Sequence, residues 1–137
     1  METGWTKEEI YLLNHRAYGF YRQGRYQEAG IIFEAVTRLD PGNGYARSAL
    51  AAVSLALGHP ERAIEQLSLL LERNPLDVEA RARRAEAYCE LASWKEVMSE
   101  LGALRRDGER HHVERLNWRL KARGVTESLA TSPPPTR

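Results

Sequence analysis

The sequence repeats itself with a period of 34 residues, and this constrains the fold more than any other feature. Gly24, Ala29, Phe33 and Pro41 return, each 34 residues later, as Gly58, Ala63, Leu67 and Pro75. A third copy begins at Ala92 and keeps the apolar positions as Val97 and Leu101, but it has lost the glycine and the proline. Self-similarity with a period of 20 to 50 residues is typical of chains that stack one supersecondary unit several times.

The residues upstream of each copy extend the pattern. The tetratricopeptide repeat (TPR) has the first-half signature W-x2-L-G-x2-Y, and the chain resembles it three times. The three copies are Leu13-x2-Arg16-Ala17-x2-Phe20, Arg47-x2-Leu50-Ala51-x2-Ser54 and Arg81-x2-Arg84-Ala85-x2-Tyr88. The small residue at which two helices touch is always alanine. Arg16 and Arg84 depart from the expected leucine.

Helix start and stop signals agree with helix pairs. Thr6-x-x-Glu9 and Ser93-x-x-Glu96 have the capping-box spacing, Asp77 suits a helix N-cap, and Pro60 suits a first helical position. We therefore expect helices over residues 6–22, 25–39, 43–57, 60–73, 77–91, 93–106 and 109–123. The predicted fold is all-α: a right-handed superhelix of three TPR helix pairs plus a C-terminal capping helix, which covers the apolar end of the last repeat.

These helices imply a domain organisation. Residues 1–5 form an N-terminal extension, and residues 6–124 form the TPR domain. Its repeats cover about 10–43, 44–77 and 78–108, and its capping helix covers 109–123. Residues 125–137 contain three consecutive prolines and are predicted to be a disordered tail.

Composition excludes several classes of function. The chain is 42% apolar and 28% charged, with a net charge of +1, so no overall field favours nucleic acid. No run of about 18 apolar residues predicts membrane insertion. The N-terminus has no signal-peptide pattern, and the single cysteine, Cys89, fits a reducing compartment. A cytoplasmic protein is expected.

Candidate binding residues follow from the TPR register. Positions 2, 5, 9 and 12 of each first helix face the concave groove of such a superhelix, which makes them the predicted partner-binding set. They are Tyr11, Asn14, Tyr18, Tyr21, Tyr45, Ser48, Ala52, Leu55, Glu79, Ala82 and Glu86, with Cys89 at the last of these positions. The groove thus begins aromatic and ends acidic, and tyrosines offer large contact area with few torsions to immobilise. Alternatively, Tyr18 or Tyr21 packs against the next helix.

TPR modules that hold chaperone C-termini use lysine, arginine and asparagine to bind two carboxylates. The corresponding positions here are Asn14, Tyr18, Ala49, Glu79 and Arg83. Only Arg83 fits that pattern, and Glu79 would repel a carboxylate. This class of partner is therefore disfavoured.

Other candidate chemistry is weak. His111 and His112 adjoin on a helix and point about 100° apart, so they are expected on the solvated surface rather than at a metal. Cys89 is expected to be a small buried or groove side chain. Basic residues of the last helix, such as Arg115 and Arg119, could meet an acidic partner or RNA, but a solvated face is favoured. We expect no catalysis, no cofactor and no metal.

The first repeat carries more than the general pattern. Ala17-Tyr18-x2-Tyr21-x2-Gly24-x-Tyr26-x2-Ala29-x3-Phe33, followed by Leu39-Asp40, resembles the class II chaperones of bacterial type III secretion, and Ala85-Glu86 matches that family in the third repeat. Thr6-Lys7 and Leu12-Leu13-Asn14 resemble a sister group that chaperones an early export component. The resemblance covers roughly residues 10–105. It implies a groove that accepts an extended, apolar-anchored segment of an aggregation-prone client.

The sequence-based hypothesis is therefore a bacterial cytosolic chaperone that binds a protein client as an extended segment. The client would be a type III secretion substrate or export component. A heterodimer with the client is one oligomeric state that the sequence leaves open. The alternative is a structural adaptor that joins folded proteins through its outer surface, where Ile31, Ile32, Leu69 and Leu71 need not all be buried.

Overall fold

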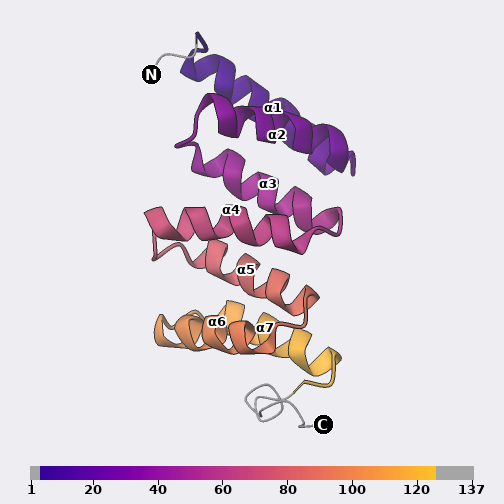
Figure 1. Cartoon of the computed structure of the whole chain (residues 1–137), viewed down its shortest axis with the longest axis vertical. Coiled ribbons are helices and arrows are strands. Elements are labelled where there is room, and N and C mark those ends of the chain that lie inside the picture. Colours follow the sequence, from indigo (N-terminus) through magenta and orange to yellow (C-terminus); the bar gives the residue numbers. More distant parts are fainter. Residues whose placement is uncertain (1–3, 126–137) are drawn as a thin grey trace, which may run out of the picture. The chain divides into compact units, whose positions relative to one another are not determined.

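The computed structural model describes residues 4–125, and within this range the chain forms seven α-helices and no strand (Figure 1). The helices are α1 (Lys7–Arg22), α2 (Tyr26–Leu39), α3 (Gly44–Ala56), α4 (Pro60–Arg73), α5 (Val78–Glu90), α6 (Trp94–Arg106) and α7 (Arg110–Ala122). The predicted all-α class and the predicted helix pairs are confirmed. Most of the predicted tail lies outside the described residues.

Six of the seven helices begin one residue after the predicted start, because the predicted first residue is the N-cap. Thr6 forms the predicted capping box with Glu9, and the Asp77 carboxylate accepts a hydrogen bond from the Ala80 amide. Pro60 occupies the first turn of α4 as expected. The second capping box is wrong, since the Ser93 side chain makes no capping hydrogen bond. Ser93 has ψ 71°, whereas Thr6 is fully extended with ψ 164°.

The chain divides into two compact units, residues 1–75 and residues 76–137. The N-terminal unit contains α1 to α4, which make up the first two repeats. The C-terminal unit contains the third repeat and the capping helix α7. None of the described helices is both long and apolar enough to cross a lipid bilayer.

In the N-terminal unit, α2 packs between α1 and α3, and α4 packs against α3. Its core is formed by seven buried side chains, namely Ile10, Ala17, Ala29, Phe33, Val36, Ala46 and Val53. Phe33 and Val36 are fully buried, and they lie on one face of α2 at helical spacing. Three of the seven core residues are alanines, which lets the helices approach one another closely.

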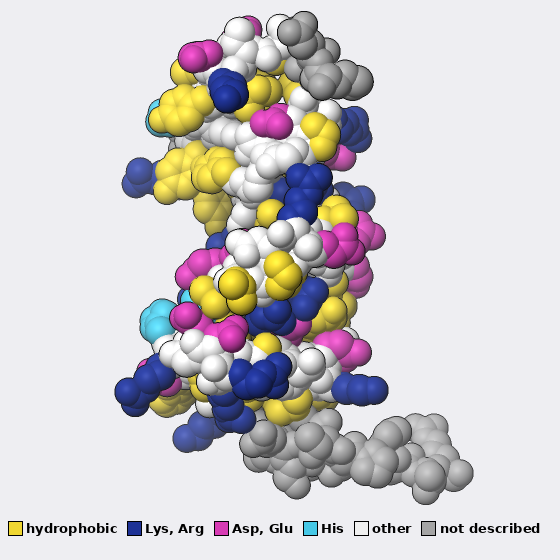
Figure 2. Space-filling model, turned by 90° about the vertical axis from the view of Figure 1, so that its left-hand side faces the viewer, with side chains coloured by type: hydrophobic (Ala, Val, Ile, Leu, Met, Phe, Trp, Pro, Cys, Tyr) yellow, Lys and Arg dark blue, Asp and Glu magenta, His cyan; other side chains and the backbone are white. Residues whose placement is uncertain are grey.

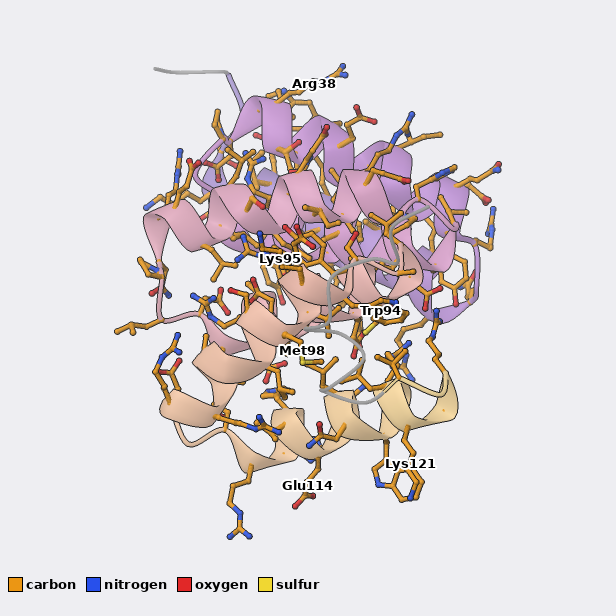
Figure 3. All side chains as sticks on the ribbon, turned by 60° about the horizontal axis from the view of Figure 1, so that its bottom comes forward. Arg38, Trp94, Lys95, Met98, Glu114 and Lys121 are labelled. Atoms are coloured by element: carbon orange, nitrogen blue, oxygen red, sulfur yellow. The ribbon has the colours of Figure 1, made fainter. Side chains whose placement is uncertain are left out.

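In the C-terminal unit, α7 packs against both α5 and α6. Its core consists of Ala85, Cys89, Val97, Leu101, Leu104, Leu116 and Leu120. Trp94 and Met98 of α6 pack against this core, whereas Glu114 and Lys121 point outward from α7 (Figure 3). Val125 also packs against the core, and its amide donates a hydrogen bond to the Leu120 carbonyl. The packed C-terminal unit therefore includes Val125, the first residue of the predicted tail.

The turn inside each helix pair needs a residue in the left-handed region. Gly24 and Gly58 occupy it in the first two repeats with φ of 76° and 80°. Ala92 occupies the equivalent turn in the third repeat with φ of 54°, the only described non-glycine residue with positive φ. A left-handed conformation costs an L-residue about 1–2 kcal/mol relative to glycine. The third copy has therefore kept the backbone turn after losing the residue that favours it.

A polar network replaces apolar packing in the third repeat. Glu100 of α6 is buried and accepts hydrogen bonds from Nε and Nη2 of Arg84, and Nη1 of Arg81 lies 3.3 Å from its other oxygen. In the second repeat, Arg47 and Gln66 lie 34 positions before Arg81 and Glu100. Nη1 of Arg47 donates a hydrogen bond to Oε1 of Gln66 at 2.7 Å. Arg84 thus departs from the TPR leucine because a buried carboxylate faces it.

We expect Ala92→Gly to stabilise the protein by about 0.5–1 kcal/mol, because relief of the left-handed strain exceeds the entropy that glycine loses on folding. The measurement is chemical unfolding monitored by circular dichroism. Gly58→Ala is the matched control and should lose a comparable amount. Equal stability of Ala92→Gly and the parent protein would contradict the assigned turn conformation.

Removing the Glu100 carboxylate should reduce the free energy of unfolding by more than either change at the turns. Glu100→Ala leaves two partly buried guanidinium groups without their shared partner, and we expect a loss of about 2–3 kcal/mol in the free energy of unfolding. The double variant Arg84→Leu/Glu100→Gln recreates the side chains that the second repeat has at these positions. It should unfold within about 1 kcal/mol of the parent. A double variant as unstable as Glu100→Ala would show that the two repeats pack differently here.

Candidate functional site

A large hollow lies in the N-terminal unit, along α1 and the start of α3. It has a volume of about 960 Å³. It is lined by Gly4, Trp5, Thr6, Lys7, Ile10, Tyr11, Asn14, His15, Tyr18, Leu39, Asp40, Asn43 and Tyr45. We call this hollow the tyrosine groove. Figure 2 shows hydrophobic side chains gathered along one flank of the part of the molecule that carries it.

Three tyrosines form the walls of the tyrosine groove. Tyr11, Tyr18 and Tyr45 are 66%, 45% and 52% exposed, although each carries a large apolar ring. Tyr45 is held by an edge-to-face contact with the buried Phe33, with ring centroids 6.1 Å apart. Partial burial raises the pKa of Tyr45, and the nearby Tyr18 and Tyr11 raise it further. The phenol groups of these three tyrosines therefore lie close together.

Asn14 lies between these tyrosines on α1 and also lines the groove. Its side chain is buried, with only 7% of the residue exposed, and its Oδ1 atom has no hydrogen-bond partner. Buried polar atoms in folded proteins are nearly always paired, so an unpaired one marks a position of interest. Asn14 therefore borders the groove, while its Oδ1 atom is enclosed by the protein itself.

The charge of the tyrosine groove is close to balanced. Lys7 and Asp40 carry opposite charges, and Asp40 accepts a hydrogen bond from Nδ2 of Asn43 at 3.2 Å. His15 adds an imidazole that stacks on Tyr11, with ring centroids 6.2 Å apart. Nothing in this lining favours a strongly charged ligand.

Four predicted site residues of the N-terminal unit lie outside the tyrosine groove. Tyr21 is partly buried and packs against the core, with its ring 5.4 Å from that of Tyr26. Ser48, Ala52 and Leu55 of α3 are also partly buried and do not line the hollow. Tyr21 is therefore a core residue, which was the alternative left open by the sequence.

The predicted acidic residues lie in the C-terminal unit, where α7 engages them. Oε1 of Glu79 is 3.0 Å from Nε2 of His112, and Glu86 pairs with Arg115 at 3.2 Å. Ala82 and Glu86 line a cavity of only about 30 Å³ against α7, which is room for about one water molecule. The basic face of α7 thus meets the glutamates of α5 within the same chain.

Nine of the thirteen residues that line the tyrosine groove were not among the predicted binding residues, and three of them are instructive. His15 lies four residues after Tyr11, so helical spacing could have placed it on the same face. Trp5 precedes α1 and Asp40 follows α2, and neither belongs to a repeating helical position. Only the tertiary fold brings these two side chains to the groove.

The histidine pair also differs from expectation. His111 is exposed, but His112 is buried and bonded to Glu79 rather than solvated. The reason is that α7 turns one histidine toward α5 and the other away from it. Among residues 4–125, no three histidine, cysteine or acidic side chains gather as metal ligands would.

Comparison with known proteins agrees with this architecture. Residues 20–79 match the family model described as tetratricopeptide repeat. No curated protein matches the sequence. The helix pairs and the 34-residue register together confirm the predicted TPR fold.

Solved structures of similar fold include two chaperones of type III secretion. PcrH of Pseudomonas aeruginosa, in complex with the chaperone-binding region of PopD, has a TM-score of 0.77 at 20% identity, over 89% of this chain and 96% of that one. The Yersinia enterocolitica type III secretion chaperone SycD, with a peptide of the translocator YopD, has a TM-score of 0.70 at 19% identity, over 82% and 95%.

A third similar structure belongs to a different functional group. The first TPR of Spaghetti (RPAP3), bound to an HSP90 peptide, has a TM-score of 0.75 at 19% identity, over 88% of this chain and 97% of that one. The predicted resemblance to type III secretion chaperones is thus confirmed at the level of the fold. Peptide-binding TPR domains of other kinds share the same fold.

Cys89 holds the last groove position of the third repeat, but it is fully buried in the C-terminal core. Burial raises the pKa of its thiol from 9.0 to about 11, and the positive charges of Arg119 and Arg123 offset only part of this effect. The Cys89 carbonyl also accepts a hydrogen bond from Nη1 of Arg123 at 3.1 Å. Of the two places expected for Cys89, a buried position or the groove, the structure shows the buried one.

We expect the Cys89 thiol to react with a disulfide reagent at pH 8 at least 100-fold more slowly in the folded protein than in urea. A pKa of about 11 instead of 9.0 leaves roughly 100-fold less thiolate at that pH, and burial blocks access as well. The release of thionitrobenzoate measures the rate, with Cys89→Ser as the blank. Rapid labelling of the folded protein would contradict the buried position.

Proposed function

We propose that this protein is a peptide-binding TPR module that holds an extended segment of a client protein in the tyrosine groove. The observation that carries this proposal is the exposure of Tyr11, Tyr18 and Tyr45 around one hollow of about 960 Å³. Ligand sites typically measure roughly 300–1,000 Å³ and combine apolar walls with a few polar groups. The tyrosine groove fits that description at its upper end.

The lining supports a client segment with apolar anchors. Tyrosine rings that are half exposed bury additional apolar surface when a ligand covers them, and interface hot spots are enriched in tyrosine for this reason. The near balance of Lys7 and Asp40 gives no advantage to a charged tail. A partner with aliphatic or aromatic side chains along an uncharged stretch therefore suits this groove best.

Type III secretion supplies the most specific candidate for the client. The first repeat resembles the class II chaperones of that system. PcrH and SycD, two structures of similar fold, are described in complex with segments of the translocators PopB, PopD and YopD. We infer a bacterial cytosolic chaperone for a secretion component. The HSP90-type alternative requires a set of lysine, asparagine and arginine residues that this chain matches at only one of five positions, with Glu79 where a lysine is needed.

The adaptor hypothesis has less support. Ile31 is 69% exposed on α2 and Leu69 is 44% exposed on α4, whereas Leu71 is buried. Ile31 and Leu69 are not at equivalent positions of the two repeats, and scattered single exposed apolar residues are normal on a protein surface. No line of apolar residues at equivalent repeat positions marks the outer surface of the N-terminal unit as a docking site.

The test is the loss of the client from a groove variant. Truncating a central aromatic side chain at an interface typically costs about 2 kcal/mol or more, which is roughly a thirty-fold loss of affinity. We expect Tyr18→Ala/Tyr45→Ala to lose the client that the parent protein co-purifies from its native host, as identified by mass spectrometry. Circular dichroism should show unchanged helix content, because Tyr18 and Tyr45 are about half exposed.

Ile31→Ser on the outer surface is the matched control and should retain the client. The adaptor hypothesis predicts the reverse pattern, in which Ile31→Ser loses the partner and the tyrosine variant keeps it. Unfolding of the tyrosine variant would show that these rings stabilise the core, and would remove the basis of the proposal.

A further inference from the structure

We propose that a hollow beside the end of α7 is a docking site for the chain's own residues 126–131, with the side chain of Leu129 as the group that fills it. These residues directly follow the last described residue, Val125. The site lies in the C-terminal unit and does not depend on the tyrosine groove.

The hollow is lined by residues of α6, of α7 and of the turn after α7, and it has a volume of about 430 Å³. Leu101 and Leu120 line it and are almost completely buried, whereas Met98 and Val125 line it and are only partly buried. An apolar side chain placed here would remove further apolar surface from water, which is favourable. The hollow therefore suits a leucine or a side chain of similar character.

The turn after α7 repeats a backbone pattern found elsewhere in the described chain. The Gly124 amide donates to the Lys121 carbonyl at 3.0 Å, and the Val125 amide donates to the Leu120 carbonyl at 2.9 Å. These two bonds form a Schellman motif, with Gly124 in the left-handed region at φ of 69°. The same pair of bonds follows four earlier helices, with the left-handed residue at Gly24, Gly58, Ala92 and Gly108.

Each of these four turns leads into a helix that begins two residues after the left-handed residue. The fifth residue after the left-handed position then packs inward. Ala29, Ala63 and Val97 are completely buried at this place, and Val113 packs against the C-terminal core. Leu129 is the fifth residue after Gly124, and it is the one large aliphatic residue of 126–137. The repeated turn thus predicts that Leu129 returns toward the helix pair that the chain has just left.

The position of the segment favours it over any other occupant. Leu129 follows Val125 by four residues, a stretch that spans at most about 14 Å, and Val125 itself lines the hollow. A segment joined to the rim of a site has an effective concentration on the order of millimolar, which a separate molecule rarely reaches. Pro133 limits the segment, because a residue before proline disfavours the helical conformation. The predicted disordered tail is then reduced to residues 132–137.

The charges are complementary as well. Arg105 and Lys121 line the hollow, and no acidic side chain does. Residues 126–131 contain one charged residue, which is Glu127. A second copy that presented the same surface would instead bring like charges together, which is unfavourable.

The test uses the full-length chain with carbon-13 in the methyl groups of methionine, leucine and valine. Leu129→Ser removes the proposed anchor and identifies the methyl signals of Leu129 in the parent spectrum. Ser128→Leu/Leu129→Ser is the matched control, because it keeps the composition and moves the leucine by one residue. On a helix this rotates the side chain by about 100°.

In the parent protein, we expect nuclear Overhauser effects between the methyl groups of Leu129 and those of Met98 and Val125, since these groups would be in contact. The control should lose the effect to Met98. Amide hydrogen exchange in the last turn of α7 should be at least about ten-fold faster in both variants, because the hollow is then open to water and the burial of a leucine is lost.

Every other result would overturn the proposal. Absence of a Leu129–Met98 effect in the parent protein would show that this segment does not fill the hollow. Equal exchange rates in the parent and in both variants would show the same. A mixture of labelled and unlabelled protein separates the remaining case. If the effect arises only between two molecules, the occupant is a second copy, and docking within one chain is wrong.

Discussion

The close approach of paired helices at alanine is the contact on which the rest of this structure depends. Ala17, Ala51 and Ala85 are completely buried at equivalent positions of the first helices, and Ala29 and Ala63 are completely buried in the second helices. A larger side chain at these positions would separate the two helices, because helix interiors are packed to crystal-like density. With the backbones fixed at this distance, the polar and aromatic positions of each repeat are presented at constant places. Function can then vary without any change to the scaffold.

Two repeat positions near this contact, those of Leu13 and Ile32, show how far the side chains can vary between repeats. Leu13 and Ile32 of the first repeat pack against the core, and the equivalent residues of the second repeat, Arg47 and Gln66, form a neutral hydrogen bond. In the third repeat the same slots hold Arg81 and the buried Glu100. Each solution satisfies its polar atoms locally, which is what burial requires of any polar group.

Asn14 does not follow this rule, since its side-chain oxygen Oδ1 is buried and has no hydrogen-bond partner.

Charge distribution separates the two units in a way that bears on function. In the C-terminal unit, Arg115, Arg119 and Arg123 of α7 pair with Glu86 and Glu90 of α5, so the acidic positions there are engaged by the chain itself. These pairs are partly exposed, and each contributes little to stability. Their larger effect is to cover the first-helix face of the third repeat. In the N-terminal unit the corresponding face keeps its tyrosines exposed, which is why the candidate site lies there.

The sequence by itself determined the repeat, the helix pairs and the capping residues Thr6 and Asp77, because these depend on local spacing and on side chains within one or two turns. The repeat register also selected Tyr11, Asn14, Tyr18 and Tyr45, which line the same hollow, since a helical register fixes which residues share a face. Only the tertiary structure decided which of the predicted residues are open. Tyr21 and Cys89 occupy groove positions of the register but pack in the two cores, and Glu86 is engaged by α7. Trp5 and Asp40 enter the groove from outside the register. The physical reason is that burial depends on which helix covers a face, and that neighbour comes from a distant part of the sequence.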